Sequence, residues 1–503
     1  MIVVDLLLGF SNLFSNFEAL FFVFLAAIVG IVIGALPGLT AAAAIAMLLP
    51  LSFHLGPLEA LAFLYVIGKS ARYGGSIAAI LFNTPGTTAS AATMLDGYPM
   101  TQRGESGKAL KTATIASVVG DYIGEIILIF GAVFIASFTK KFGPTEYFAI
   151  YVMAFIVIGS VVGSSVIKGI LSTLFGALIA LIGSDTITNQ ARMTLGFAEL
   201  EEGLALVPLL IGVFVISEII IQAENTAKSE LIGLGEADER NPSANHMTWL
   251  EFKRCIPIMI RSSIVGSIIG MLPGLGSSVA CFVAYGEEKR RSKEQEKWGT
   301  GIVEGIAAPE SANNAVSGPS MIPLLTLGIP GSTIAAILIG VFLIHGIQVG
   351  PAIFDTAYSR GLMFSLFAAG LLGIAGYGII GYWGGPWIGR MVSKIPARLL
   401  YPFIFLTAIA ASYSSRASIL DVAIALFFGI IGYGMRRTNF SAAAFVIAFV
   451  LANNMEEAFR QALLLSDDGV LIFVKEPVSL AFLVVGFGVM VYRSYSVMRA
   501  KKR

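Results

Sequence analysis

Four Pro-Gly pairs interrupt long apolar stretches of this chain, and they form two matching sets. Residues 37–38 and 85–86 make the first set, and residues 273–274 and 330–331 make the second. Proline has no backbone N–H and glycine loosens the backbone, so each pair is expected to interrupt a helix. In a bilayer the freed backbone groups are tolerated only where protein or a water-filled cavity satisfies them. Matching interruptions in two halves of a membrane chain are typical of the binding site of a secondary transporter.

The composition places the chain in a membrane. Of its 503 residues, 56% are hydrophobic and 13% are charged, whereas soluble domains carry about 25% charged residues. Apolar runs of spanning length recur between Glu18 and Tyr492. We therefore predict an all-α polytopic protein with about 10–12 membrane segments in the lipid bilayer. The net charge of +1 gives no indication of a nucleic-acid partner.

The sequence around the first break is nearly repeated in the second half. Residues 34–40 read Gly-Ala-Leu-Pro-Gly-Leu-Thr, and residues 270–276 read Gly-Met-Leu-Pro-Gly-Leu-Gly. We predict a first membrane repeat over residues 1–222, a polar connecting loop over 223–254 and a second membrane repeat over 255–503.

Lysine and arginine are distributed oppositely in the two halves. Residues 51–56 contain none and the corresponding residues 286–299 contain five, whereas residues 96–111 contain three and residues 344–361 contain one. Because positive residues favour cytoplasmic loops, this bias predicts two inverted repeats. It requires the segments around the first break of each repeat to enter and leave the membrane on one side. It also places the N-terminus outside and the C-terminus in the cytoplasm.

Long motifs flank the breaks in both halves. The first half contains Tyr73-Gly-Gly-Ser-Ile, Asn83-Thr-Pro-Gly-Thr and Asp96-Gly-Tyr-Pro; the second contains Ala308-Pro-Glu-Ser-Ala-Asn-Asn-Ala and, at residues 322–332, Ile-Pro-Leu-Leu-Thr-Leu-Gly-Ile-Pro-Gly-Ser. These segments resemble the TctA family, the large membrane subunit of tripartite tricarboxylate transporters. The resemblance implies uptake of carboxylates such as citrate across the bacterial inner membrane, driven by a cation gradient. It also implies two partners, a small four-helix membrane subunit and a periplasmic solute-binding protein.

Candidate substrate-binding residues surround the second break of each repeat. The N–H ends of interrupted helices suit a carboxylate, and their carbonyl ends suit a cation. Helix kinks packed by small residues are the alternative. On a helix Glu310, Asn313 and Asn314 share one face, where the asparagines either bind carboxylate oxygens, as the resemblance favours, or clamp two helices. The candidates are Asn83, Thr84, Pro85, Gly86, Thr87, Thr88, Asn313, Asn314, Gly331, Ser332, Thr333 and Arg72.

Candidate cation-binding residues follow the first break of each repeat. Their hydroxyls and the freed carbonyls would suit sodium, which prefers oxygen ligands; hydroxyls bonded back to their own helices are the alternative. These candidates are Gly38, Thr40, Gly274, Ser277 and Ser278.

Four charges lie in otherwise apolar segments. Lys69 and Arg72 are three residues apart, Asp121 and Glu125 are four apart, and each pair shares a helix face. Ionisable groups in the membrane are costly and are usually paired or functional. One interpretation is a structural ion-pair cluster. The other gives Arg72 to a substrate carboxylate and Asp121 or Glu125 to proton coupling.

The function that these patterns favour is secondary active import of a small di- or tricarboxylate, coupled to sodium or protons. We expect a break-bearing core to move against a scaffold, as in an elevator. The alternatives are an organic-anion channel and a non-transporting membrane scaffold. No catalytic or metal-binding motif is present, so neither an enzyme nor a cofactor other than the coupling ion is expected.

Overall fold

The computed structural model describes residues 2–36, 38–84, 86–161, 165–185, 187–226, 245–394 and 397–501. Pro37 and Pro85, which belong to the two breaks of the first repeat, lie outside these residues. Within them the chain is almost entirely helical, and its only sheet pairs two strands of two residues each. Nine helices in this part of the chain are long and apolar enough to cross a membrane. The prediction of an all-α polytopic membrane protein is confirmed.

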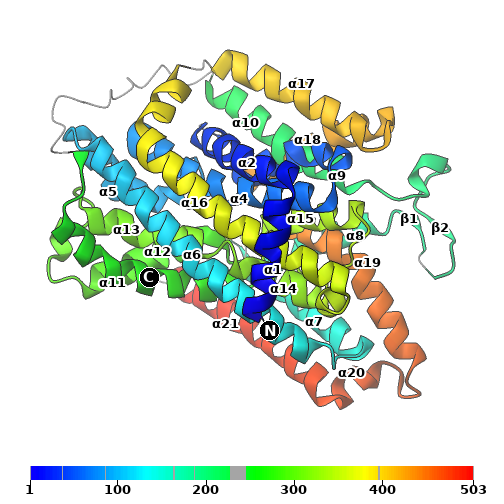
Figure 1. The fold of residues 1–503 in the computed structure, drawn as a ribbon. Helices are drawn as coiled ribbons and strands as arrows, with labels where there is room; N and C mark the ends of the chain where they lie inside the picture. The colour runs from blue at the N-terminus through cyan, green and yellow to red at the C-terminus, as the bar shows by residue number, and fades with distance from the viewer. Residues whose placement is uncertain are drawn as a thin grey trace.

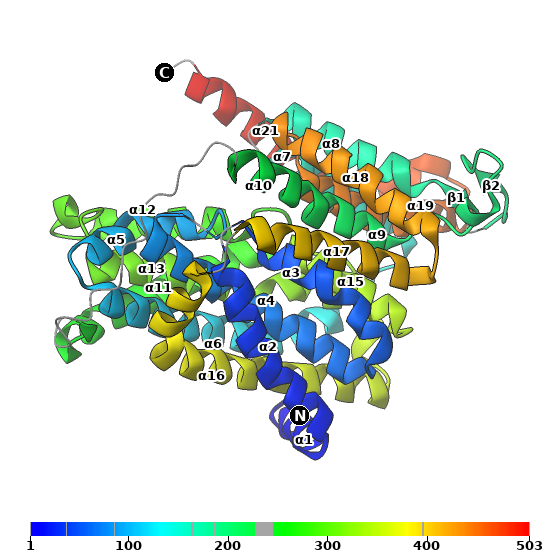
Figure 2. The same cartoon turned by 90° about the horizontal axis from the view of Figure 1, so that it is seen from above.

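The helices form two layers, which Figure 2 shows one above the other. The core layer consists of α1 (Ile2–Ser15), α2 (Phe17–Ala35), α3 (Ala41–Leu48), η1 (Leu49–His54), α4 (Pro57–Phe82), α5 (Ser90–Gln102), α6 (Ser106–Thr139), α11 (Trp249–Met271), α12 (Gly276–Arg291), η5 (Gln295–Lys297), α13 (Val303–Ala315), η6 (Pro319–Met321), α14 (Ile322–Leu327), α15 (Thr333–Ile344), η7 (Pro351–Phe354) and α16 (Ala357–Ser393).

The outer layer contains the helices that follow the core helices in each half. It consists of α7 (Pro144–Val161), α8 (Val166–Ala180), β1 (Gly183–Ser184), β2 (Ala191–Arg192), η2 (Ala198–Leu200), α9 (Leu206–Leu210), the π-helical η3 (Ile211–Ile216), α10 (Ser217–Thr226), α17 (Ala397–Arg416), α18 (Ile419–Arg437), α19 (Ala442–Leu464), η8 (Gly469–Leu471), α20 (Ile472–Lys475) and α21 (Pro477–Lys501). In Figure 1 the β1–β2 hairpin and α20 lie at the right-hand end of the molecule, and α5, α11 and α12 lie at the left-hand end.

The segment around the first break turns the chain back on itself. α2 and α4 are parallel neighbours: the Asn16 amide donates a 2.5 Å hydrogen bond to Glu59 at their starts, and Gly34 packs against Ala71 further along. A Cβ on Gly34 would lie 2.2 Å from the Ala71 carbonyl oxygen, so only glycine permits this approach. Since both helices start on one side, α3 and η1 must return between them. The segment is therefore the predicted re-entrant hairpin.

The second half repeats this arrangement. Near the starts of α11 and α13, Arg254 and Glu304 form a 3.7 Å ion pair. Further along the same two helices, Gly266 packs against Ala312. α11 and α13 are therefore parallel, and α12 returns between them from the break at Pro273.

The contacts of α6 establish the relative direction of the two halves. α4 runs antiparallel to α6, because Tyr65 and Lys69 meet Glu125 and Asp121 respectively. α6 in turn runs parallel to α13.

The parallel packing of α6 on α13 rests on glycines. Gly120 packs against Ser311, and Gly124 packs against Ala315 one turn later on both helices. Consequently α4 is antiparallel to α13, the helix that occupies the equivalent place in the second half. Inverted repeats require this relationship.

The helices extend into both ends of the predicted polar loop. α10 continues to Thr226, and α11 begins at Trp249 behind a capping box in which Thr248 and Glu251 bond to each other's backbone N–H groups. Residues 227–244 of that loop lie outside the described residues. The division into repeats at 1–222 and 255–503 remains a prediction.

Candidate functional site

A cavity of about 290 Å³ lies between the core layer and the outer layer. This volume is near the lower end of ordinary small-molecule pockets, which span roughly 300–1,000 Å³. The predicted residues that line it are Thr40, Arg72, Thr87, Thr88, Gly274, Ser277, Ser278, Asn313, Gly331, Ser332 and Thr333. The structure thus brings the candidate substrate and cation residues of both halves to one place.

Four helix N-termini converge on this cavity. α3 begins after Thr40, α5 begins at Ser90, α12 begins at Gly276 and α15 begins after Ser332. Each N-terminus presents unpaired N–H groups and about half a positive elementary charge. Such ends favour a negatively charged ligand.

Two of the four N-termini are already capped by hydroxyls. Thr40 accepts from the Ala43 N–H at 3.2 Å, and Ser332 accepts from the Ala335 N–H at 3.2 Å. The N-cap residues of α5 and α12 make no side-chain cap. The Ser90 N–H at the start of α5 nevertheless donates a 3.2 Å hydrogen bond to Thr87 Oγ1. The N-terminus of α12 therefore keeps more donors for a ligand than the other three.

Two buried side chains at the cavity carry polar atoms without partners. Arg72 is 6% exposed and its Nη1 has no hydrogen-bond partner. Asn313 is 1% exposed, and neither its Oδ1 nor its Nδ2 is bonded. Leaving such a group unpaired costs about 1–3 kcal/mol. A carboxylate in the cavity would satisfy both donors.

Arg72 is separate from the other three predicted charges. Lys69 Nζ lies 2.6 Å from Asp121 Oδ1 and 2.8 Å from Glu125 Oε2, and all three side chains are fully buried. Tyr65 donates a 2.7 Å hydrogen bond to Glu125. One lysine thus holds two carboxylates inside the core layer, while Arg72 lines the cavity one helical turn away.

Five of the described substrate and cation candidates do not line the cavity: Gly38, Asn83, Thr84, Gly86 and Asn314. Asn83 ends α4 in the left-handed conformation, with φ +53°, and Gly86 packs closely on Gly75. Asn314 donates a 3.2 Å hydrogen bond to the backbone carbonyl of Glu310. Asn83 and Gly86 therefore shape the second break of the first half, whereas Asn314 bonds within α13.

Glu310 joins the two halves through hydroxyl groups. Its buried carboxylate accepts from Ser76 at 2.6 Å, from Ser117 at 2.9 Å and also from Thr93. These donors belong to α4, α6 and α5, which all precede the connecting loop. Among the described residues no group of three or more His, Cys, Asp or Glu side chains could hold a metal ion.

Sequence reasoning missed the outer-layer wall of the cavity. This wall consists of Phe214, Arg436, Ala443 and Ile447. Arg436 stands beside Arg437 in the sequence, where the pair indicates only a cytoplasmic loop. No local signal distinguishes the two arginines, because the cavity is formed by helices distant in the chain.

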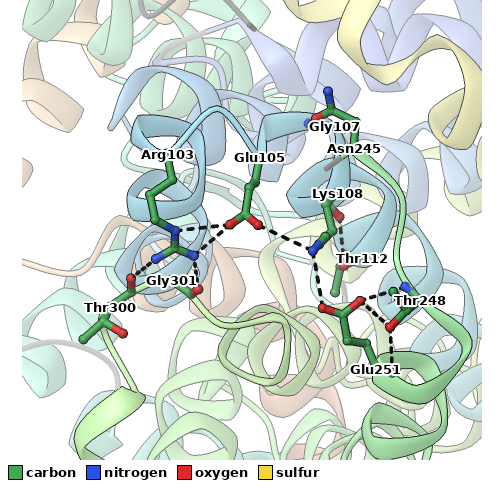
Figure 3. Close-up of polar contacts among 10 residues, drawn as sticks. All are labelled: Arg103, Glu105, Gly107, Lys108, Thr112, Asn245, Thr248, Glu251, Thr300 and Gly301. Carbon is green, nitrogen blue, oxygen red and sulfur yellow. Dashed lines mark hydrogen bonds and ion pairs between the residues drawn. The ribbon is translucent and has the colours of Figure 1, made fainter. Parts of the chain in front are cut away.

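A second cavity, of about 690 Å³, is lined by charged side chains near the α5–α6 turn. Figure 3 shows that Arg103 donates to the carbonyl oxygens of Thr300 and Gly301 and that Glu105 bridges Arg103 and Lys108. Lys108 also lies 3.3 Å from Glu251. These contacts tie the two halves of the core layer together.

The fold and the cavity between the two layers define the class of protein to which this chain belongs. The chain is a polytopic membrane protein in which interrupted helices from two inverted repeats surround a cavity suited to an anion. A family model described as the tripartite tricarboxylate transporter TctA family matches residues 20–447. The chain belongs to this family and is a component of a tripartite tricarboxylate transporter, which fits the expectation that it is not an enzyme.

Two proteins of Agrobacterium vitis are similar to this chain. One, named "Uncharacterized 52.8 kDa protein in TAR-I ttuC' 3'region", is 36% identical over 507 residues, covering 100% of this chain and 98% of the relative. The other, named "Uncharacterized protein in TAR-II ttuC' 3'region", is 35% identical over 240 residues, covering 47% of this chain and 97% of the relative. No solved structure matches the chain.

Proposed function

We propose that this protein imports a small di- or tricarboxylate by secondary active transport and binds it in the cavity between the two layers. One observation carries the proposal: four helix N-termini, the Arg72 guanidinium and the Asn313 amide all meet at that cavity. A carboxylate would accept charge-assisted hydrogen bonds from Arg72 and further bonds from the N–H groups of α5 and α12.

The coupling ion has two candidate sites. The hydroxyls of Thr40, Ser277 and Ser278 border the same cavity and offer oxygen ligands to sodium. Alternatively, Asp121 or Glu125 carries a proton, since both carboxylates share one lysine. Either ion would favour occupation of the site by an anion.

The two layers support an alternating-access mechanism of the elevator type. All the interrupted helices belong to the core layer, and Ala443 and Ile447 on α19 offer it an apolar wall. Movement of the core layer along this wall would carry the cavity from one side of the membrane to the other.

Family membership supports the partners and the location. We propose a periplasmic solute-binding protein that delivers the carboxylate, a small four-helix membrane subunit, and residence in the bacterial inner membrane. Arg103, Lys108 and the basic end of α12 would face the cytoplasm together with the C-terminus, and the N-terminus would lie outside.

Uptake into proteoliposomes tests the proposal. Vesicles would contain this chain and its small subunit, with the binding protein outside, and labelled citrate and succinate would be supplied with a sodium gradient, a proton gradient or neither. Accumulation above equilibrium under one gradient is expected. Equilibration that ignores both gradients would favour a channel, and the absence of flux would favour a scaffold.

A further inference from the structure

The only charged side chains that line the cavity, among the described residues, are Arg72 and Arg436. Arg72 belongs to α4 of the core layer, and Arg436 belongs to the last turn of α18 in the outer layer. The two arginines therefore stand on opposite walls. Phe214, Ala443 and Ile447, the other outer-layer residues of the wall, are apolar.

Arg436 is held by an anion of its own layer. Its Nη1 forms an ion pair with Oε2 of Glu218 on α10. The Glu218 side chain is 9% exposed and does not line the cavity, whereas the Arg436 side chain is 26% exposed. The arginine is thus accessible from the cavity, and its partner lies behind it.

We infer that Arg436 binds the second carboxylate of the substrate and that Glu218 is the resident partner which this carboxylate displaces. The inference rests on the proposed function and deepens it. A dianion would bind Arg72 through one carboxylate and Arg436 through the other, so it would bridge the two layers. A monocarboxylate needs Arg72 alone.

The need of a second carboxylate for its own cation supports this assignment. The Arg72 charge offsets one carboxylate, and a buried second carboxylate without a cation would carry a large desolvation cost. Arg436 is the remaining cation at the cavity, and its own charge stays paired when a substrate carboxylate replaces Glu218. The displaced Glu218 loses its cation and keeps the 2.8 Å hydrogen bond from the Gln222 amide, so part of the binding free energy is spent on this exchange. The guanidinium also suits bidentate recognition of a planar carboxylate.

The neighbouring arginine provides a matched control. Arg437 pairs with Glu224 of α10 just as Arg436 pairs with Glu218, but Arg437 does not line the cavity. A purely structural ion pair between α10 and α18 would give both arginines the same kind of role.

The test compares ligand binding by the purified full-length chain and its variants. The rise in melting temperature would be titrated with acetate, succinate and citrate for Arg436→Ala, Glu218→Gln, Arg437→Ala and Arg72→Ala. Arg436→Ala is expected to weaken succinate and citrate binding about tenfold or more while leaving acetate binding unchanged. Glu218→Gln is expected to tighten succinate and citrate binding, because it removes the competing carboxylate. Arg437→Ala should bind all three ligands like the wild type.

A purely structural ion pair would make Arg436→Ala and Glu218→Gln change ligand binding in the same direction, whereas the inference predicts opposite directions. If Arg436→Ala and Glu218→Gln weaken binding alike, or if Arg436→Ala affects acetate as strongly as citrate, the inference is wrong. If Arg436→Ala does not fold, the affinity of Glu218→Gln for succinate and citrate tests the inference, and unchanged or weaker binding would contradict it. Loss of binding in Arg72→Ala with a normal Arg436→Ala would overturn this inference alone. A wild-type chain that binds none of the three ligands would remove the proposed function as well.

Discussion

Thr88 Oγ1 lies 2.5 Å from Ser278 Oγ, and this contact joins the N-terminus of α5 in the first half to the N-terminus of α12 in the second. Both residues line the cavity, and the N-cap residue of neither helix makes a side-chain cap. The two hydroxyls therefore set the spacing between two positive helix ends that the inverted repeats bring together.

Removing this contact should reveal coupling between the two halves. Thr88→Val and Ser278→Ala are each expected to weaken citrate binding, and the double variant should lose less affinity than the sum of both. The coupling free energy should be about 0.5–1.5 kcal/mol, the usual net contribution of one hydrogen bond. A double-mutant cycle of ligand-induced melting shifts measures it, and strict additivity would show that the two hydroxyls act independently.

Lys69 should be far more important to stability than an exposed lysine. Lys69→Met leaves Asp121 and Glu125 buried without their cation, which typically costs about 3–5 kcal/mol. Lys140→Ala removes an exposed ion pair with Asp355 and should cost at most about 1 kcal/mol. Denaturation in detergent compares the two variants. Equal losses of stability would contradict the buried cluster.

Asn313 and Asn314 should respond differently to replacement although they are adjacent. Asn313 has no partner at the cavity, so Asn313→Ala should weaken carboxylate binding and leave the melting temperature nearly unchanged. Asn314 bonds to the Glu310 carbonyl away from the cavity, so Asn314→Ala should lower the melting temperature and affect binding less. Melting curves and carboxylate-binding curves of both variants test this. If Asn314→Ala weakens carboxylate binding more than Asn313→Ala does, Asn314 and not Asn313 is the ligand-binding residue.

The loop before β2 should contribute to acid sensitivity. Hydrogen bonds from the Thr188 backbone N–H, then from the Arg460 guanidinium and the Ile187 N–H, hold the pKa of Asp185 well below its usual range. A carboxylate with a lowered pKa in the folded state stabilises the protein above its unfolded pKa of about 4. That contribution is lost as the pH falls from there toward the folded-state pKa. Asp185→Asn should therefore flatten the melting temperature between about pH 5 and pH 3 relative to the wild type. Identical pH profiles would show that Asp185 gains nothing from these bonds on folding.

Several features of the fold could be predicted from the sequence because they depend on residues within one short segment. A Pro-Gly pair favours a helix interruption through its own backbone, although single prolines such as Pro257 and Pro309 lie inside helices. Apolar length sets which segments can cross a membrane. The re-entrant segments at Gly38 and Gly274 and the antiparallel relation of α4 to α13 follow the predicted break pattern and charge bias. α11 begins at Trp249, inside the predicted polar loop, where Thr248 and Glu251 carry a capping-box signal in the sequence.

The sequence predicted only part of the site. Helix periodicity shows which residues share one face of a helix, but it does not show which other helix packs against that face. Lys69 and Arg72 share a face of α4, yet the tertiary structure buries Lys69 against α6 and leaves Arg72 at the cavity. Packing likewise places Asn313 at the cavity and Asn314 away from it, although the two are adjacent in the sequence. Arg436 became part of the cavity only because α18 of the outer layer faces the core layer there. The amino-acid sequence was enough to locate the helix breaks and the residues around them. Which of those residues share one cavity depends on tertiary packing, because the cavity is formed by contacts between segments hundreds of residues apart.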